Sequence, residues 1–197
     1  NEYSIENLIR NIKKDFESLD FVVHALAYSD KEELRGKYIE TSRQNFLSTL
    51  DISTYSFTRV AKYASKIMRN GGSFLTLTYV GSNKTTPNYN VMGVAKAALE
   101  TSVKYLSVDL GKNNIRVNAI SAGPMKTIAG AAISGARHVY RYSEKIAPLQ
   151  KNPDLEQVGN AALYLLSDIS SGVTGLTHYV DGGLKVVGIP NQDMVNI

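Results

Sequence analysis

Apolar residues follow two spacings along the chain, and the two spacings alternate. In some segments they recur every three or four positions, which is typical of one face of an α-helix. In others they form short runs rich in β-branched and aromatic side chains, which are typical of strands. The expected helices cover residues 4–17, 46–68, 89–110 and 154–166, and the expected strands cover residues 21–26, 73–80, 115–120 and 176–180.

This alternation predicts the fold class. Helices and strands that alternate along a chain build a parallel sheet with helices on both faces, so we predict one doubly wound α/β domain over residues 1–197. The apolar run at residues 21–26 indicates a strand buried on both faces. In such sheets ligands bind beyond the carboxyl ends of the strands, so the segments after Leu26, Thr78 and Ile120 form the candidate site.

Local signals refine two segments. Asp154 and Gln157 have the spacing of a capping box at the start of the last helix. Residues 122–145 are rich in small side chains and are expected to form short helices.

The composition excludes several functions. The chain is 43% apolar and 20% charged, and it holds no apolar run of about 18 residues, so no membrane helix is expected. The net charge of +4 is scattered among acidic residues, which argues against a nucleic-acid partner. There are no cysteines, and His24, His138 and His178 lack ligand spacing, so we expect no metal site. The first ten residues do not resemble a signal peptide, and a cytoplasmic protein is expected.

Tyr89 and Lys96 stand seven residues apart, about two helical turns, and therefore share one helix face. Two other tyrosines, Tyr55 and Tyr105, also precede a lysine by seven residues, so spacing alone does not establish a site. Only Tyr89 begins a helix just after a strand, where its hydroxyl can reach the carboxyl edge of the sheet. A neighbouring lysine would favour the ionised phenol. A packed tyrosine and a surface lysine are the alternative interpretation.

Four motifs then resemble a known family. The sequences TYVGSNKTTPNYNVMGVAKAALE, IRVNAISAGPMKT, VGNAALYLLSD and VDGG follow one another in the order seen in bacterial enoyl-acyl-carrier-protein reductases. These enzymes are an NADH-dependent branch of the short-chain dehydrogenase/reductase superfamily. The resemblance runs from about Phe21 to Gly183 and implies a Rossmann-like domain, a cytoplasmic homotetramer and a role in type II fatty-acid biosynthesis.

The resemblance also implies the catalytic residues. Tyr89 matches the family's catalytic tyrosine, Lys96 the lysine that holds the nicotinamide ribose, and Tyr79 a second active-site tyrosine. Hydride is expected to pass from NADH to the β-carbon of a trans-2-enoyl thioester carried by acyl carrier protein. The Tyr89 hydroxyl would stabilise the negative charge that develops on the thioester oxygen. A strand-end tyrosine with its hydroxyl in water is the alternative for Tyr79.

Two further groups of residues follow from the resemblance. Residues 128–145 correspond to a substrate-binding lid, and Met92 and Ile133 fall where the family lines the acyl tunnel, although both residue types are also common in cores. Other positions match cofactor-binding segments, in which a tight turn orients the nicotinamide carboxamide and an apolar side chain packs on its ring. These positions are Ala25, Leu26 and Ala27 after the first strand, and Ile120, Gly123, Pro124 and Thr127 after the third.

The sequence departs from the family at its beginning. No glycine cluster precedes residues 21–26, although the family begins with a strand, a Gly-rich turn and a helix that hold the pyrophosphate. About 65–75 residues of that unit are therefore expected to lie outside this sequence. They include the positions that choose between NADH and NADPH, so NADPH is not excluded.

Two rival functions stay open at this stage. One is a 3-ketoacyl or other carbonyl reductase of the same superfamily, which pairs its tyrosine with a serine about 13 residues earlier, and Thr76 occupies that position. The other is a truncated, non-catalytic scaffold that self-associates through the helices at residues 46–68 and 89–110. Substrate preference and cofactor binding separate these possibilities.

Overall fold

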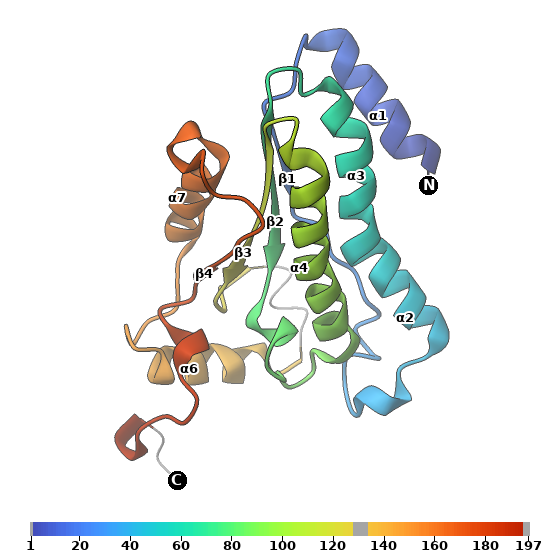
Figure 1. Cartoon of the computed structure of the whole chain (residues 1–197). Helices are drawn as coiled ribbons and strands as arrows, with labels where there is room; N and C mark the ends of the chain where they lie inside the picture. Colours follow the sequence, from blue (N-terminus) through green and yellow to red (C-terminus); the bar gives the residue numbers. More distant parts are fainter. Residues whose placement is uncertain (1, 128–133, 195–197) are drawn as a thin grey trace.

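A computed structural model describes residues 2–127 and 134–194, and it contains a four-stranded parallel sheet (Figure 1). The strands are β1 (Phe21–His24), β2 (Gly72–Thr78), β3 (Ile115–Ala122) and β4 (Thr177–Val180), and they lie side by side in sequence order. Because all pairs are parallel, the carboxyl ends of the strands share one edge, where Thr78 lies beside Ser121. The predicted α/β fold is confirmed.

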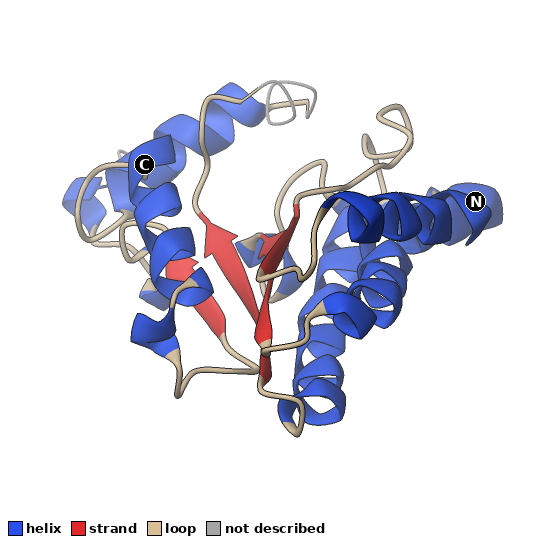
Figure 2. Ribbon diagram, turned by 90° about the horizontal axis from the view of Figure 1, so that it is seen from above, coloured by secondary structure: helices blue, strands red, loops and turns tan. Residues whose placement is uncertain are grey.

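Helices cover both faces of the sheet (Figure 2). One face carries the layer of α1, α3 and α4, whereas α7 packs on β2 and β3 from the other face. No helix among the described residues is both long and apolar enough to cross a membrane. The helices are α1 (Glu2–Asp15), α2 (Arg43–Leu50), α3 (Ser56–Ala64), α4 (Asn90–Gly111), α6 (Ala136–Ile146) and α7 (Leu155–Leu166).

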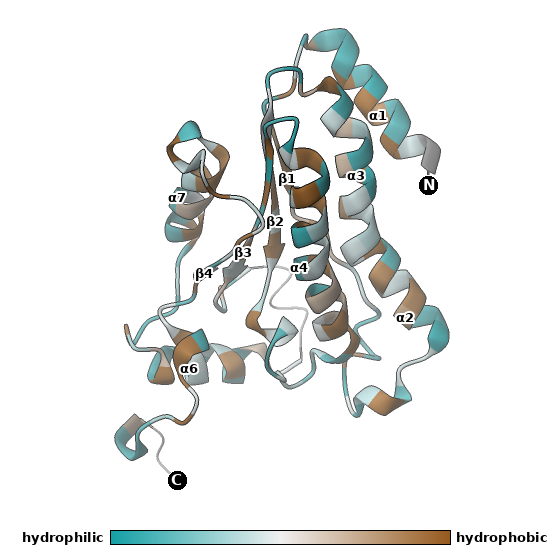
Figure 3. Cartoon of the chain, in the orientation of Figure 1, coloured by the Kyte–Doolittle hydropathy of each residue, from teal (hydrophilic) through white to brown (hydrophobic). Residues whose placement is uncertain are grey.

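Side-chain alternation along β2 divides the core into two layers. Phe74 packs with Phe57 of α3 on one face, and Leu75 packs with Leu165 of α7 on the other. All four of these side chains are fully buried. The apolar residues accordingly line the inner faces of the helices and the strands between them (Figure 3).

Three expected elements differ in detail. The helix expected over residues 46–68 is continuous from α2 to α3 but contains one π-helical segment, Asp51–Tyr55. Within residues 122–145, β3 extends to Ala122 and α6 begins at Ala136, while residues 128–133 lie outside the described part. The prediction that the first strand is buried on both faces is wrong, because Phe21 and Val23 are 51% and 46% exposed. Among the described strands, β1 lies at the edge and pairs with β2 alone.

The predicted capping box at the start of α7 is present. The Asp154 carboxylate accepts a hydrogen bond from the Gln157 backbone N–H at 2.8 Å, and the Gln157 side-chain oxygen accepts from the Asp154 backbone N–H at 3.1 Å. Replacing such a cap by alanine typically costs about 1 kcal/mol. We expect Asp154→Ala to lower the free energy of unfolding by ~1 kcal/mol in denaturant titrations. Asp154→Asn, which keeps an acceptor oxygen, should lose less than half of that, and an equal loss in both variants would contradict the capping account.

Candidate active site

Tyr89 and Lys96 lie on one face of α4, at the carboxyl edge of the sheet. Tyr89 is the residue that precedes the first turn of α4, and both side chains are buried, with 7% of each residue exposed. The Tyr79 ring packs edge-on against the Tyr89 ring, with 5.2 Å between the ring centroids. The three predicted catalytic residues are therefore neighbours in space.

Strained asparagines hold Tyr89 at the start of its helix. Asn88 and Asn90 adopt positive φ angles of 58° and 37°, a region that asparagine tolerates better than most residues. The side chain of Asn88 donates to the Ser134 carbonyl oxygen at 2.9 Å, and that of Asn90 donates to the Leu34 carbonyl oxygen at 3.1 Å. These bonds help to hold the backbone on both sides of Tyr89 in this conformation.

Two glycines make room for the Tyr89 ring. A Cβ atom on Gly81 would lie 2.5 Å from Cδ1 of Tyr89, and one on Gly93 would lie 2.7 Å from the carbonyl oxygen of Gly81. The turn that follows β2 therefore approaches α4 more closely than any residue with a side chain would allow. The close approach seats the Tyr89 ring against Tyr79.

Lys96 is a buried cation with one hydrogen-bond acceptor of the protein at its ammonium group. Its Nζ donates to the Leu77 carbonyl oxygen at 2.8 Å, the one acceptor that the described residues supply. Burial lowers the pKa of Lys96 to about 8, and the charge of Glu100 acts in the opposite direction. An ammonium has three donors, so two N–H groups are left for a ligand.

The tyrosine hydroxyls stay protonated at neutral pH. Burial raises the pKa of Tyr89 above its ordinary value, and the charges of Tyr79 and Glu100 raise it further. Burial also raises the pKa of Tyr79, although a hydrogen bond with Thr86 partly offsets this effect. The idea that Lys96 favours an ionised Tyr89 thus finds no support, because desolvation dominates. Both hydroxyls are hydrogen-bond donors.

A cavity of about 280 Å³ connects these groups. Six residues predicted for the site line it: Tyr79, Tyr89, Lys96, Gly123, Pro124 and Thr127. The wall also contains Val139 and Tyr140, which belong to the predicted lid, and residues that sequence reasoning missed, among them Thr86, Pro87 and Met125. Thr86 and Pro87 lie on the segment after β2, and Met125 lies on the segment after β3. Their closeness in sequence to predicted site residues was the signal that could have identified them.

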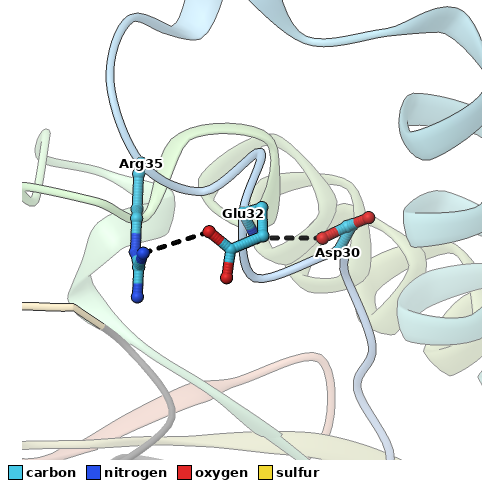
Figure 4. A network of polar contacts seen from close by, with 3 residues as sticks. All are labelled: Asp30, Glu32 and Arg35. Atoms are coloured by element: carbon cyan, nitrogen blue, oxygen red, sulfur yellow. Dashed lines mark hydrogen bonds and ion pairs between the residues drawn. The ribbon is translucent and has the colours of Figure 1, made fainter.

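The cavity does not include the predicted residues of the first loop. Ala25, Leu26 and Ala27 are exposed on the segment after β1 and are not part of the cavity wall. Farther along this loop, the Arg35 guanidinium donates to Glu32 at 3.0 Å, and the Glu32 backbone N–H donates to the Asp30 carboxylate at 2.9 Å (Figure 4).

Two other predicted residues, Ile120 and Met92, also lie apart from the wall. Ile120 is fully buried in the core beneath α7, because strand alternation turns its side chain away from Tyr89, and Met125 stands on the wall in its place. Met92 is buried in a cluster with Tyr89, Leu34, Val91 and Ala95, and it is part of the core beside Tyr89. Ile133 lies outside the described residues, as does part of the predicted lid at 128–145.

Thr76 has the spacing of a carbonyl reductase serine but faces the core. Its hydroxyl donates to the backbone carbonyl oxygen of His24 at 3.1 Å and contacts His24 Nδ1 at 3.2 Å, and the residue is fully buried. Burial, followed by the charge of Lys96, lowers the pKa of His24 to about 4, so this histidine is neutral. Thr76 is not on the cavity wall.

The residues present fit a dinucleotide. Lys96 offers two charged donors beside the tyrosines, as the hydroxyls of a ribose require. Gly123 permits the tight turn on the opposite wall, since a Cβ there would lie 2.8 Å from Cδ of Pro153. No group of three or more potential metal ligands occurs in residues 2–127 and 134–194.

Comparison with known proteins agrees with this geometry. A family model described as enoyl-(acyl carrier protein) reductase matches residues 1–185. The chain is 55% identical over 194 residues to enoyl-(acyl-carrier-protein) reductase (NADH) 1 of Rhizobium meliloti, covering 98% of this chain and 71% of the relative. It is 53% identical over 188 residues to the enoyl-(acyl-carrier-protein) reductase (NADH) FabI of Rickettsia prowazekii, covering 95% and 72%.

Solved structures give the same result. The enoyl-(acyl-carrier-protein) reductase of Anaplasma phagocytophilum, in complex with NAD, superimposes with a TM-score of 0.93 at 53% identity, covering 97% of this chain and 73% of that one. FabI of Candidatus Liberibacter asiaticus superimposes with a TM-score of 0.95 at 51% identity, covering 97% and 74%.

Proposed function

This chain belongs to the enoyl-(acyl carrier protein) reductase family, and we propose that the cavity between Tyr79, Tyr89 and Lys96 is where it reduces enoyl thioesters. The reaction is the NADH-dependent reduction of the trans-2 double bond of enoyl-acyl-carrier-protein, a step of type II fatty-acid biosynthesis. The observation that carries the site assignment is the pairing of two protonated tyrosines with one buried cation in a single cavity.

The geometry favours this reaction over the reduction of a ketone. In a carbonyl reductase a second hydroxyl beside the tyrosine holds the carbonyl oxygen, and Thr76 is the residue with the matching spacing. Its hydroxyl is bound to His24 inside the core and does not reach the cavity. Tyr79 supplies the second hydroxyl instead, from the end of β2. A non-catalytic scaffold would have no need of this arrangement.

The chain's own residues have distinct roles in the reaction. Lys96 would bind the ribose hydroxyls of the cofactor with the two N–H groups that do not bond to the Leu77 carbonyl oxygen. The Tyr89 hydroxyl donates to the thioester oxygen, where negative charge develops, and its high pKa keeps that proton in place. Tyr79, whose ring packs edge-on against Tyr89 on the same cavity wall, would place a second hydroxyl near that group. NADH, when bound, supplies the hydride that the β-carbon accepts. A proton from solvent, added to the α-carbon, would then give the saturated chain.

The proposal extends to partners and location. The acyl carrier protein presents the substrate, and the described part of the predicted lid, residues 134–145, covers the acyl chain. The protein works as a cytoplasmic homotetramer, in which α2 to α4 supply contacts between subunits. Exposed apolar side chains on these helices, such as Tyr55 and Val108, are consistent with such contacts.

Substrate selectivity tests the function. We expect the full-length protein to oxidise NADH with a 2-butenoyl thioester at least about 100-fold faster than with a 3-ketobutanoyl thioester, because the second donor is Tyr79 and not a serine-like hydroxyl. NADPH should support a slower reaction. Kinetic constants for both substrates with each cofactor provide the measurement. Preference for the ketoacyl thioester would show that the protein is a carbonyl reductase. Failure to bind NADH would favour the non-catalytic scaffold.

A further inference from the structure

Glu100 connects the two elements that carry the catalytic tyrosines. It lies one turn after Lys96 on α4 and is half-buried. Its Oε1 accepts hydrogen bonds from the Thr78 hydroxyl at 2.7 Å and from the Ser82 hydroxyl at 2.5 Å. Its Oε2 accepts a third bond from the Asn83 side-chain amide at 3.2 Å. One carboxylate on α4 thus binds three side chains, one at the last residue of β2 and two in the segment that follows.

The bonded residues enclose Tyr79. Thr78 immediately precedes this tyrosine, and Ser82 ends the turn that follows it, where the Ser82 backbone N–H donates to the Tyr79 carbonyl oxygen at 3.0 Å. Gly81, in the same turn, lies against the Tyr89 ring. The position of the turn therefore determines both the direction of Tyr79 and the space available to Tyr89.

A carboxylate suits this place better than other side chains. It is an acceptor at both oxygens, so it can receive all three donors at once. A carboxamide would keep two of the bonds through its oxygen but would present an N–H₂ group to the Asn83 amide. Glu100 is not on the cavity wall, and it therefore acts on the reaction through other residues.

We propose that Glu100 is a positioning residue for the reductase reaction, because its carboxylate holds the turn that carries Tyr79 against α4 and so aligns the two tyrosine hydroxyls. This role rests on the proposed function of the cavity. It goes beyond the roles of Tyr79, Tyr89 and Lys96, since Glu100 touches neither substrate nor cofactor. Loss of the three hydrogen bonds to Glu100 should let the turn that carries Tyr79 move. Small misplacements of a catalytic group lower the rate steeply.

Three variants of the full-length protein test the proposal. Glu100→Ala removes every bond, Glu100→Gln keeps the bonds to Thr78 and Ser82, and Asp109→Asn is the control, an acid-to-amide change at an exposed position of the same helix. Per folded molecule, we expect Glu100→Ala to lower kcat for a 2-butenoyl thioester about 30-fold, with NADH KM changed less than about threefold. Glu100→Gln should recover kcat to within about fivefold of wild type at neutral pH, and Asp109→Asn should match wild type.

The pH profile gives a readout that a purely structural role would not move. The titratable groups around Lys96 are Glu100 on its own helix, Tyr89 just before that helix, Tyr79 after β2 and His24 on β1, and burial keeps both tyrosines protonated. His24 and Tyr89 are neutral near pH 7, so Glu100 is the negative charge that favours protonated Lys96. Removal of this charge by Glu100→Gln should move the alkaline limb of kcat/KM for NADH toward lower pH. Asp109→Asn should leave the limb in place.

Hydrogen exchange separates failure of this inference from failure of the proposed function. The Ser82 and Asn83 amides should exchange at least about tenfold faster in Glu100→Ala than in wild type, whatever substrate the protein uses. Unchanged exchange, or a kcat per folded molecule within twofold of wild type in Glu100→Ala, would overturn the positioning role. If Glu100→Ala does not fold, Ser82→Ala replaces it, with a smaller expected loss of kcat and the same criteria. A wild-type protein that does not reduce enoyl thioesters would instead overturn the proposed function.

Discussion

Tyr89→Phe is expected to lower kcat for the enoyl thioester by about 10²-fold, which is the usual loss when one donor to a developing oxyanion is removed. The variant keeps the ring that packs against Tyr79 and the space provided by Gly81, so the fold and the Lys96 site should stay intact. KM for NADH should therefore stay close to the wild-type value. Steady-state kinetics with varied NADH and varied thioester give both constants.

Tyr105→Phe provides the matched control. Tyr105 also precedes a lysine by seven residues, but it is 72% exposed on the outer part of α4. This variant should have wild-type kinetics. If Tyr89→Phe kept full kcat as well, the hydroxyl would have no role in the reaction and the site assignment would be wrong.

Lys96→Ala is expected to weaken NADH binding by about 10²-fold, because charged hydrogen bonds to a ligand are worth roughly 1.5–3 kcal/mol each. The effect should depend on pH. Since the pKa of Lys96 is about 8, the ammonium loses its proton as the pH rises through that value, and wild-type affinity for NADH should fall above it. In Lys96→Ala the affinity should be low at every pH. Fluorescence titration of NADH between pH 6 and 9, where bound and free cofactor are distinguished directly, measures both effects.

Lys112→Ala controls for the loss of a positive charge. Lys112 follows the end of α4 and is exposed, far along the helix from the cavity. It should bind NADH as the wild type does, with the same pH dependence. An equal loss of affinity in Lys96→Ala and Lys112→Ala would show that general charge, and not the buried ammonium, attracts the cofactor.

The sequence predicted the fold well because the strongest signals were local. Periodic apolar residues located α4 to within one residue, and the capping box marked the start of α7. The exposed face of β1 was not predictable in this way. An apolar run indicates a strand that is suited to burial, but it does not say which segments cover that strand. The π-helical segment Asp51–Tyr55 was not predictable either, because the apolar residues on both sides of it keep a helical spacing.

The site was predictable where motif and topology coincided. Tyr79, Tyr89, Lys96 and the turn at Gly123 all lie at carboxyl ends of strands or on the helix that follows, and the fold brings them together. Ile120 was assigned to the cofactor site from the motif alone. In the structure, strand alternation directs its side chain into the core. The contribution of Glu100 was hidden because its three partners are recognisable only from the folded turn. The elevated tyrosine pKa values likewise follow from burial and not from sequence spacing.

The most direct test of the central claim is to follow a labelled hydride. The full-length protein is incubated with NADH carrying deuterium at the transferable C4 position and with a 2-butenoyl thioester, and the product is examined by NMR. We predict a saturated butanoyl thioester with deuterium on its β-carbon, formed in the wild type and about 10²-fold more slowly in Tyr89→Phe. No transfer to the enoyl substrate, together with deuterium on the hydroxyl-bearing carbon of a 3-ketobutanoyl substrate, would contradict the account.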